Sequence, residues 1–261
     1  MAYSIDLSGR VAFITGASGG LGAQFARILA QAGAAVVLAS RRLEKLKELR
    51  ASIEGEGGEA HVVELDVTDA NSISAAVGQA EREAGAIDIL VNNSGVNRRQ
   101  ALLDVDEEAY DFIFDTNTRG AFFVAQAVAR RMIARAQGAA PGTYVGGRIV
   151  NVASLAASKV LPGAGIYCMS KAAVVHMTRC MAQEWGPAGI NVNALCPGYI
   201  ATDINQRLWQ TDAGKTLMQA MPRERVGKPE DLDALIVLLA SSESHFVNGA
   251  VIAADDGFGV A

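Results

Sequence analysis

Short apolar runs alternate with longer segments of helical periodicity along almost the whole chain. The runs are rich in Val and Ile and nearly continuous in apolar character, which is typical of strands that are buried on both faces of a sheet. We predict seven strands on this basis. They are Val11–Thr15, Ala35–Ala39, His61–Asp66, Ile87–Asn92, Gly147–Val152, Ile190–Cys196 and Ala250–Ala254.

The segments between these strands carry apolar residues at the three- and four-residue spacing of helices with one buried face. Strands that alternate with helices in this way predict a parallel sheet with helices on both faces. The predicted fold class is therefore α/β, and no boundary along residues 1–261 suggests a second domain. The clearest helical segments are Leu21–Ala32, Leu43–Gly55, Asp106–Ala136 and Cys168–Trp185.

Two segments do not follow the alternation. Gln137–Gly147 is rich in Gly and is longer than a usual connection of about 4–6 residues, so we interpret it as a surface loop. The region from Tyr199 to Arg225 lacks a clear strand and predicts a helical insertion between the last two strands. Its apolar side chains include Leu208, Trp209, Leu217, Met218 and Met221.

The composition excludes several classes of protein. Half of the 261 residues are apolar and the mean hydropathy is +0.20, so the chain can bury a large core. The net charge of −5 offers no basic surface for nucleic acid or for an anionic membrane. No apolar run reaches the roughly 18–20 residues that a membrane-spanning helix needs, and Met1–Gly9 does not have the pattern of a secretory signal.

Cysteine and histidine usage argues against a metal site. Cys168, Cys180 and Cys196 are odd in number and lack the short spacing of metal ligands, and the three histidines are isolated from them. We therefore expect reduced thiols, no bound metal and a cytoplasmic location.

A glycine-rich turn follows the first predicted strand, with the sequence Gly16-Ala17-Ser18-Gly19-Gly20-Leu21-Gly22, and leads into an Ala-rich helix. Glycines allow the backbone to approach a pyrophosphate, and the helix N-terminus supplies N–H donors and a positive dipole. Such a turn can also be only a tight connection, and its spacing differs from the usual G-x-G-x-x-G. Its place between the first strand and the first helix of an alternating chain favours a dinucleotide site.

The end of the second strand indicates which dinucleotide is bound. A carboxylate at this position would hold the ribose 2′-hydroxyl of NAD, but the strand ends at Ser40 and is followed by Arg41 and Arg42. Arg41 can form a charge-assisted fork with a 2′-phosphate, and Ser40 can add its hydroxyl. The two arginines can equally be solvated residues at the start of a helix. The missing carboxylate still favours NADP(H) over NAD(H).

Four further residues suggest chemistry. Asp66 ends the third predicted strand, where it can bond an adenine amino group or cap the helix that begins near Thr68–Asn71. Ser154 follows the fifth strand, and Tyr167 and Lys171 come thirteen and seventeen residues later.

The spacing of Tyr167 and Lys171 places both on one helix face. A nearby ammonium is expected to lower the pKa of the tyrosine from about 10, so that it can transfer a proton near neutral pH. Ser154 can donate a hydrogen bond to a carbonyl oxygen as negative charge develops there. A tyrosine four residues before a lysine is also common on helix surfaces. The serine at a strand end favours the catalytic interpretation.

Taken together, these features resemble the short-chain dehydrogenase/reductase family over nearly the whole chain. The residues that carry the resemblance are Thr15 to Gly22, Asp66, Asn92-Asn93-Ser94-Gly95, Asn117 to Gly120, Ser154, Tyr167, Lys171 and Pro197 to Thr202.

The resemblance implies a single Rossmann-type doubly wound domain, residues 1–261, with a seven-stranded parallel sheet flanked by helices. It implies a catalytic set of Asn117, Ser154, Tyr167 and Lys171. In that family the tyrosine is the general acid for reduction and the serine orients the carbonyl. The lysine bonds the nicotinamide ribose and lowers the tyrosine pKa, and the asparagine holds a water in a proton relay. The implied cofactor-binding residues are Gly16, Ser18, Gly20, Leu21, Gly22, Ser40, Arg41, Asp66, Val67, Asn93, Ser94, Gly95, Tyr167, Lys171, Pro197, Gly198, Ile200 and Thr202.

The chain departs from the family pattern at two places. Ser94 replaces the usual alanine of the N-N-A-G motif, a small change that we expect to be tolerated. Many NADP-preferring relatives carry a basic residue in the glycine-rich turn, where this chain has Ser18 and Gly19. Arg41, with Arg42, is left to hold the phosphate.

The resemblance also implies how substrate and partner subunits bind. Residues of about 199–225 would form a substrate lid, although their apolar side chains can also simply pack on the core. Asn97, Arg98 and Arg99 follow the fourth strand near the expected substrate, where an arginine could attract an acidic group or be solvated. The helix around Ala121–Met132, the helix after Tyr167 and the C-terminal Asp255-Asp256-Gly257-Phe258 imply a homotetramer or a homodimer.

We therefore expect an NADP(H)-dependent oxidoreductase that interconverts a carbonyl and a secondary alcohol. The pattern is similar to 3-oxoacyl-acyl-carrier-protein reductases, so the substrate is expected to be a ketone or an acyl thioester. A dehydrogenase of a sugar, a steroid or another secondary alcohol is the alternative. A third hypothesis is a catalytically silent, cofactor-binding regulatory protein, against which the intact set of four catalytic residues argues.

Overall fold

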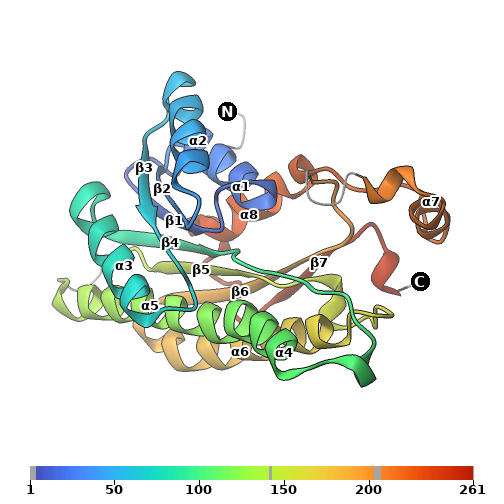
Figure 1. Cartoon of the computed structure of the whole chain (residues 1–261). Coiled ribbons are helices and arrows are strands. Elements are labelled where there is room, and N and C mark those ends of the chain that lie inside the picture. Colours follow the sequence, from blue (N-terminus) through green and yellow to red (C-terminus); the bar gives the residue numbers. More distant parts are fainter. Residues whose placement is uncertain (1–3, 141–142, 203–206, 261) are drawn as a thin grey trace.

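A seven-stranded sheet forms the centre of the computed structural model, which describes residues 4–140, 143–202 and 207–260 (Figure 1). All strand pairs are parallel, in the order β3-β2-β1-β4-β5-β6-β7. The strands are β1 (Val11–Thr15), β2 (Ala35–Ser40), β3 (Ala60–Glu64), β4 (Ile87–Asn92), β5 (Gly147–Val152), β6 (Ile190–Pro197) and β7 (Val251–Ala254).

The strand order reverses between β1 and β4. The chain moves outward from β1 through β2 to β3, crosses back to form β4 beside β1, and then moves outward on the other side. In open parallel sheets, ligands bind outside the carboxyl ends of the strands at such a reversal. The glycine-rich turn after β1 lies at this point.

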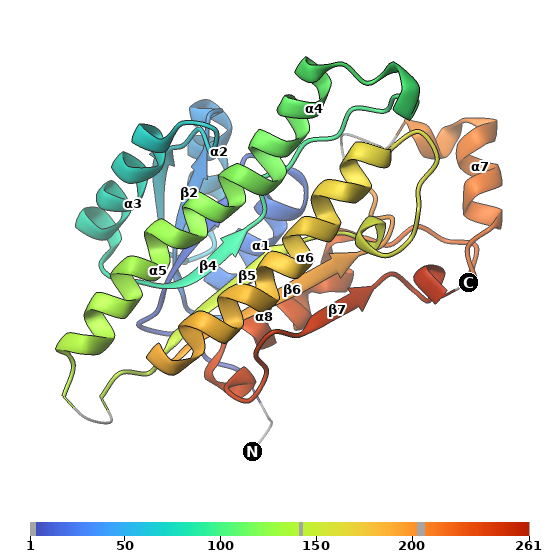
Figure 2. The same ribbon diagram turned by 90° about the horizontal axis from the view of Figure 1, so that it is seen from below.

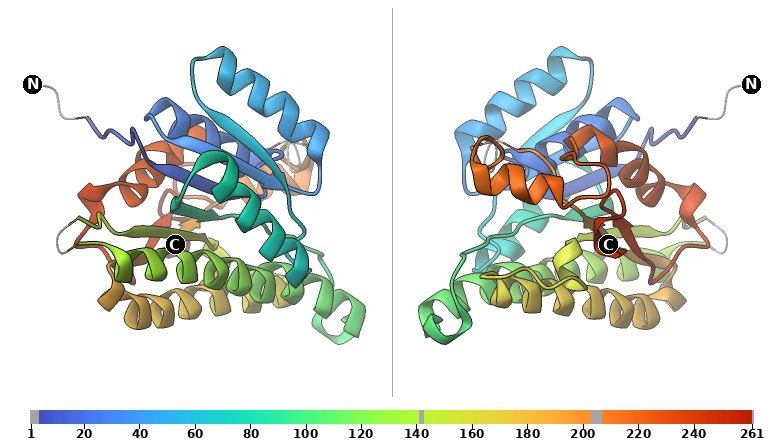
Figure 3. Two further views of the ribbon diagram at one scale, coloured as in Figure 1. Left: turned by 90° about the vertical axis from the view of Figure 1, so that its left-hand side faces the viewer. Right: turned by 90° about the vertical axis from the view of Figure 1, so that its right-hand side faces the viewer.

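Helices cover both faces of the sheet, with α1, α2 and α8 on one face and α3, α5 and α6 on the other. Figure 3 shows α5 and α6 side by side on their face. The helices are α1 (Gly20–Gln31), α2 (Leu43–Gly55), α3 (Ala70–Ala84), α4 (Glu107–Phe114), α5 (Ala121–Gly138), α6 (Gly165–Trp185), α7 (Asp212–Gln219) and α8 (Asp233–Ala240).

The apolar residues of the central strands divide between two cores. Ile14 and Leu38 pack under α1, α2 and α8, whereas their neighbours Phe13 and Val37 pack under α3, α5 and α6. All four side chains are fully buried. Each such burial contributes roughly 1.5–3 kcal/mol to folding, so strands that are apolar on both faces hold the two layers together.

The predicted fold class is confirmed, and the element ends differ by a few residues. The third strand ends at Glu64, two residues before Asp66, because Asp66 bends the backbone by accepting hydrogen bonds from the amide and hydroxyl of Thr68. The helix that carries Tyr167 begins at Gly165, three residues earlier than predicted. The second and sixth strands are each one residue longer than predicted, and the seventh starts one residue later.

The predicted helix over Asp106–Ala136 is not continuous. Residues Asp115–Gly120 form a π-helical turn between α4 and α5. The side chain of Asn117 leaves this turn to bond the backbone of Val96, and a Cβ at Gly120 would lie 2.6 Å from the carbonyl oxygen of Val67. Helical periodicity alone does not reveal such a turn, and π-turns are frequent at functional sites.

The segment between β6 and β7 carries α7, as the predicted helical insertion requires, and its residues 203–206 lie outside the described ranges. Its role as a substrate lid stays a prediction. Figures 1 and 2 both place α7 and the C-terminal end of the chain at the same end of the molecule. Leu155, Met221 and Phe258 form a small apolar cluster at that end, against which Tyr199 and Trp209 pack.

Within the described ranges, no helix combines the length and the apolar character that crossing a membrane requires.

Candidate active site

The glycine-rich turn brings β1 close to its own helix. Gly16 and Gly20 have φ angles of +66° and +55°, which side-chain-bearing residues rarely adopt. A Cβ at Gly22 would collide with the carbonyl oxygen of Gly16. The turn therefore depends on glycine at all three of these positions.

The N-terminus of α1 is suited to bind an anion. Its N-cap residue is Gly19, which provides no capping side chain, and the first turn contains no acidic residue. Its amide groups and the positive end of the helix dipole thus face the end of the sheet without a carboxylate to neutralise them. This arrangement fits a pyrophosphate.

The two arginines after β2 take different positions. Arg42 Nε donates to Ser18 Oγ at 3.0 Å and so reaches across the glycine-rich turn. Arg41 Nη1 lies 3.7 Å from a carboxylate oxygen of Asp66, and the Arg41 side chain is 68% exposed. Ser40 Oγ accepts the amide N–H of Arg42 at 3.1 Å. The sequence favoured Arg41 as the main ligand of a 2′-phosphate, whereas the structure places Arg42 closer to the glycine-rich turn.

Asn93 and Ser94 connect β4 to the same turn. Their amide groups both donate to Thr15 Oγ1 at 2.9 Å, and Asn93 Nδ2 donates to the Thr15 carbonyl oxygen at 3.1 Å. These bonds brace the carboxyl end of β4 against the end of β1. Sequence reasoning did not assign a role to Thr15, whose hydroxyl is the common acceptor. A buried hydroxyl residue directly before the glycine-rich turn is the signal that could have found it.

Ser154 and Tyr167 meet at the carboxyl end of β5. Ser154 lies close enough to Tyr167 to lower the pKa of the tyrosine hydroxyl in part, and Ser154 Oγ accepts the amide N–H of Ala156 at 3.1 Å. The hydrogen bond from the Ala156 amide holds Ser154 Oγ in place and uses the oxygen only as an acceptor. The hydroxyl proton of Ser154 can therefore be donated to another group. Two hydroxyl groups therefore lie side by side at the edge of the sheet.

The predicted lowering of the Tyr167 pKa by Lys171 is wrong for the protein chain by itself. Burial raises the pKa of Tyr167, and Ser154 lowers it in part. Lys171 Nζ lies 5.8 Å from the centre of the tyrosine ring and donates to the Val152 carbonyl oxygen at 2.9 Å. Burial also lowers the pKa of Lys171 to about 8, because a buried ammonium loses its hydration.

Asn117 lies in the π-helical turn and is buried. Its Nδ2 group donates to the Val96 carbonyl oxygen at 2.9 Å and to Ser170 Oγ at 3.0 Å, and its Oδ1 accepts the Val96 amide at 2.7 Å. Both amide protons are therefore used to hold the loop after β4 against α6. A Cβ at Gly95 would lie 3.4 Å from both Asn117 Oδ1 and Lys171 Nζ, so a larger residue would crowd these two groups.

The segment after β6, from Gly198 to Thr202, lies beside the glycine-rich turn. Gly198 lies against Asp255, since a Cβ there would be 2.6 Å from the Asp255 Cα atom. Ile200 forms a bridge with Gly227. Thr202 Cγ2 would lie 3.6 Å from a Cβ at Gly20, which places this threonine beside the glycine-rich turn.

The remaining predicted residues lie at the same edge of the sheet or just below it. Leu21 is in the first turn of α1, Val67 is buried in the core under α3, and Pro197 is the last residue of β6. The described residues contain no group of three or more His, Cys, Asp or Glu side chains that could hold a metal.

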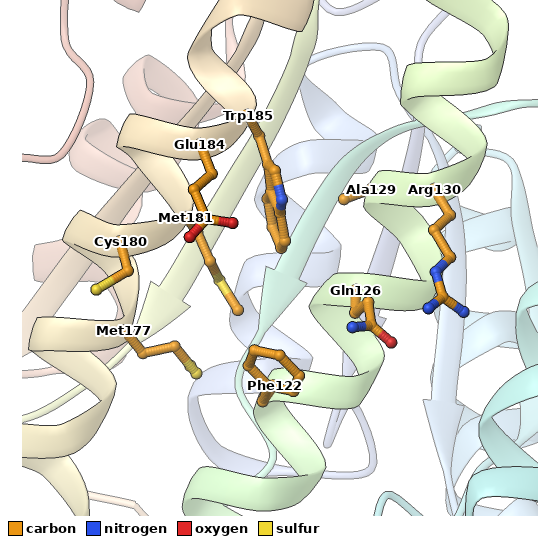
Figure 4. A pocket seen from close by; sticks show the side chains of 9 residues that line it. All are labelled: Phe122, Gln126, Ala129, Arg130, Met177, Cys180, Met181, Glu184 and Trp185. Atoms are coloured by element: carbon orange, nitrogen blue, oxygen red, sulfur yellow. The ribbon is translucent and has the colours of Figure 1, made fainter.

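A groove on the outer surface lies away from this edge. It is formed by α5 and α6, and Figure 4 shows Phe122 of α5 with Met177, Met181 and Trp185 of α6 in the space between the two helices. None of the predicted catalytic or cofactor-binding residues lines it.

Comparisons with known proteins show which proteins this chain resembles. A family model described as Enoyl-(Acyl carrier protein) reductase matches residues 16–259. Gluconate 5-dehydrogenase of Gluconobacter oxydans is 40% identical over 256 residues, which cover 98% of this chain and 96% of that protein. The 3-oxoacyl-acyl-carrier-protein reductase of Thermotoga maritima is 37% identical, with 96% and 98% covered. A solved gluconate 5-dehydrogenase from Burkholderia cenocepacia, in complex with NADP and tartrate, aligns with a TM-score of 0.91 at 37% identity over 98% of both chains.

Proposed function

Since the chain belongs to the short-chain dehydrogenase/reductase family, we propose that it oxidises a secondary hydroxyl of a small polyhydroxy compound, or reduces the matching ketone, with NADP(H). Its general activity is that of an NAD(P)-dependent oxidoreductase that interconverts a carbonyl and a secondary alcohol, as the sequence predicted. The similarity to the Thermotoga maritima protein is compatible with the predicted 3-oxoacyl reductase activity. The two gluconate 5-dehydrogenases favour the predicted alternative, a sugar-type dehydrogenase.

The observation that carries the proposal is the Ser154–Tyr167 hydroxyl pair beside a buried lysine. When bound, the nicotinamide supplies or accepts the hydride. In this proposal Tyr167 Oη gives a proton to the substrate oxygen during reduction and removes it during oxidation. Ser154 donates a hydrogen bond to the same oxygen as negative charge develops. Lys171 holds the nicotinamide ribose, and its positive charge favours the tyrosinate once both groups share the closed site.

The other end of the cofactor would lie along the glycine-rich turn. The amides of Gly20, Leu21 and Gly22 would contact the pyrophosphate, and Thr202 would contact the nicotinamide carboxamide. Asn117 would hold the loop after β4 and the water of a proton relay. Asp66 would bond the adenine amino group. Val67, Ser94, Gly95, Pro197, Gly198 and Ile200 would line the remaining walls.

NADP(H) is proposed over NAD(H) because the end of β2 carries cations and no carboxylate. Arg42 and Ser18 already meet at the turn, and Arg41 and Ser40 flank them. A 2′-phosphate placed there would receive charge-assisted hydrogen bonds from a guanidinium fork. The NADP in the Burkholderia cenocepacia structure supports this choice.

A homotetramer is proposed from two surfaces that a single chain leaves open. One is the apolar groove between α5 and α6. The other is β7, one of the two edge strands of the sheet, where Val251 is 38% exposed and the preceding Phe246 is 95% exposed. Two different self-complementary surfaces on one chain generate a closed tetramer with two-fold symmetry axes.

The test is an assay of cofactor-linked turnover with the purified protein. D-gluconate, D-glucitol, simple ketones and a 3-oxoacyl thioester are each offered with NADP(H) and with NAD(H). Tyr167→Phe is expected to lower kcat by about 10²- to 10⁴-fold, because it removes the transferred proton, while most of the NADP(H) affinity is retained.

Tyr110→Phe is the matched control, since Tyr110 is 39% exposed on α4 and stacks on Phe114. It should behave as the wild type does. Turnover that survives in Tyr167→Phe would contradict the assigned chemistry, and faster turnover with NAD(H) would contradict the proposed cofactor.

A further inference from the structure

The first turn of α6, which carries Tyr167, has little local support. Its N-cap residue is Ala164, which offers no capping side chain, and this turn contains no acidic residue. A helix end without a capping bond leaves backbone amides unpaired and is less stable than a capped one. A tyrosine that transfers a proton must nevertheless keep one position. Contacts from other elements therefore have to fix this turn.

Ser170 is the residue at which such contacts meet. It lies three residues after Tyr167 on α6 and is fully buried. Its Oγ donates to the Tyr167 carbonyl oxygen at 2.8 Å and accepts a hydrogen bond from Asn117 Nδ2 at 3.0 Å. Asn117 Oδ1 in turn accepts the Val96 amide at 2.7 Å. An unbroken chain of hydrogen bonds thus runs from the loop after β4 to the backbone of Tyr167.

The π-helical turn makes a second contact with the same residue. Thr118 Oγ1 donates to the Ser170 carbonyl oxygen at 3.5 Å. Asn117 and Thr118 are consecutive in the turn Asp115–Gly120, and the side chains of both meet α6 at Ser170. Hydrogen bonds that follow one another in a poorly hydrated interior polarise and strengthen each other. The turn is therefore coupled to α6 through Ser170.

We propose that Ser170 is a positioning residue, which couples the π-helical turn at Asn117 to Tyr167 and holds the tyrosine hydroxyl where the proton is transferred. The inference rests on the proposed function, because it assumes that Tyr167 transfers this proton. Since Ser170 is fully buried between α6 and the turn, it acts through Tyr167 and not by contact with the substrate. Without its hydroxyl, one amide proton of Asn117 lacks an acceptor in a buried site, which is costly.

The first test is Ser170→Ala, which removes the hydroxyl. It should lower kcat by about 5- to 50-fold, because an unpaired buried donor displaces the groups around it. The dissociation constant of NADPH, followed by nicotinamide fluorescence, should stay within about threefold of the wild-type value, since the glycine-rich turn is unchanged.

The loss in Ser170→Ala should also depend on pH. Oxidation of the alcohol needs the tyrosinate, and a tyrosine displaced from Lys171 ionises at a higher pH. The curve of kcat against pH for oxidation should therefore move to higher pH by about half a unit or more. A loss of kcat that is the same at every pH would show only a less stable protein and would overturn the proposal.

Threonine and valine at position 170 have nearly the same shape and differ by the hydroxyl. Ser170→Thr should keep kcat within about threefold of the wild type, because a threonine hydroxyl in a helix can bond the carbonyl three or four residues before it. Ser170→Val should behave as Ser170→Ala does. This pair also tests the proposal where Ser170→Ala folds poorly. Equal kcat values for Ser170→Thr and Ser170→Val would refute it.

Thr178 on the same helix provides the matched control. It is fully buried, donates to the Val174 carbonyl oxygen at 2.8 Å and accepts a hydrogen bond from Asn151 Nδ2 at 2.9 Å, so it resembles Ser170 in burial and in bonding. Thr178→Val should lower the melting temperature about as much as Ser170→Ala does, and it should leave the pH dependence of kcat unchanged. An equal shift of the curve in both variants would contradict a special role for Ser170.

Backbone hydrogen exchange separates this inference from the proposed function, because it needs no turnover. Amides of residues 165–171 should exchange faster in Ser170→Ala than in the wild type, whereas those of residues 176–185 should not. Full turnover in Tyr167→Phe would reject the proposed chemistry and leave the exchange result as evidence for the structural link. Unchanged exchange at residues 165–171, or faster exchange with a wild-type kcat, would reject the positioning role of Ser170.

Discussion

Arg41 and Arg42 are adjacent in the sequence, and their side chains leave the end of β2 in different directions. Arg42 bonds Ser18 in the glycine-rich turn, whereas Arg41 lies near Asp66. The sequence could predict that a cation stands at this point. It could not predict which arginine reaches the turn, because the direction of a side chain at a strand end depends on the first turn of the following helix.

We expect Arg42→Ala to weaken NADPH binding by about 10- to 100-fold, which corresponds to the loss of charge-assisted hydrogen bonds to a phosphate. Arg41→Ala should have a smaller effect. Neither variant should change the NADH affinity by more than about threefold, because NADH lacks the 2′-phosphate. Titration of each protein with NADPH and NADH, followed by nicotinamide fluorescence, measures the four affinities. Equal losses for the two cofactors would refute the assignment.

The residues that we predict to be catalytic mark the limit of what the sequence reveals about single side chains. The four-residue spacing predicted that Lys171 lies beside Tyr167, and the structure has both on α6. The direction of the tyrosine pKa was predicted wrongly. That direction depends on burial, and burial depends on how α6 packs on β5 and β6, which a local spacing does not contain.

At the scale of elements, the segment that carries α7 is tied to the C-terminal segment by one carboxylate. Asp256 accepts a hydrogen bond from Arg225 Nε at 2.7 Å, and its other carboxylate oxygen lies 3.3 Å from Arg223 Nη1. Asp256 also has a φ angle of +55°, which aspartate and asparagine tolerate better than most residues. The pair of arginines and this carboxylate therefore hold the connection after α7 beside the segment after β7.

Asp256→Asn keeps the shape and the backbone preference and removes the charge. We expect it to loosen the α7 segment, which should appear as a severalfold higher substrate KM and as faster proteolysis between α7 and α8 at pH 7. Asp212→Asn is the control, since Asp212 pairs with Lys215 within α7 itself. Equal proteolysis rates for the two variants would show that the Asp256 contacts do not hold the segment.

The direction in which the pKa of Asp256 is shifted determines how its contact with Arg225 depends on pH. Hydrogen bonding to Arg225 lowers the pKa of Asp256 below its ordinary value of 3.8. The folded state therefore favours the charged carboxylate of Asp256. The stabilisation that this contact provides is present above pH 3.8 and is lost as the pH falls through the lowered pKa. The wild type should thus keep its protease resistance relative to Asp256→Asn down to about pH 4, and the two should converge in stronger acid.

The apolar pattern of the sequence predicted some helices and strands better than others. The apolar strands and the longest helices were predicted to within a few residues, because burial on both faces of a sheet leaves a strong pattern. The π-helical turn at Asp115–Gly120 was missed. Its cause is a side-chain bond from Asn117 to Val96, twenty-one residues away in the chain, and no local pattern encodes that partner.

At the scale of the whole molecule, the surfaces that one chain leaves open lead to the last prediction. Phe122 is 36% exposed at the groove between α5 and α6. If the proposed tetramer forms through this groove, Phe122→Asp is expected to convert it to a smaller species, because the change places two carboxylates near each other across a two-fold axis. Light scattering after size-exclusion chromatography measures the mass.

Val145→Asp is the control for this prediction, since Val145 is an exposed apolar residue on the loop before β5. It should elute with the wild-type mass. A wild-type mass for Phe122→Asp would remove the groove from the proposed assembly, and a monomeric wild type would remove the tetramer.

The site spans residues that are far apart in the chain, and this distance has a consequence for how the protein is made. The bonds of Asn93 to Thr15 join positions 78 residues apart, and Thr202 reaches the turn that begins at Gly16. A ribosome that adds about 5–20 residues per second exposes β1 to β4 well before α6 and β6. The nucleotide-binding half can therefore fold on the nascent chain while Tyr167 is still being synthesised. A nicotinamide cofactor that binds this half early would stabilise it and favour its docking with the half that carries Tyr167.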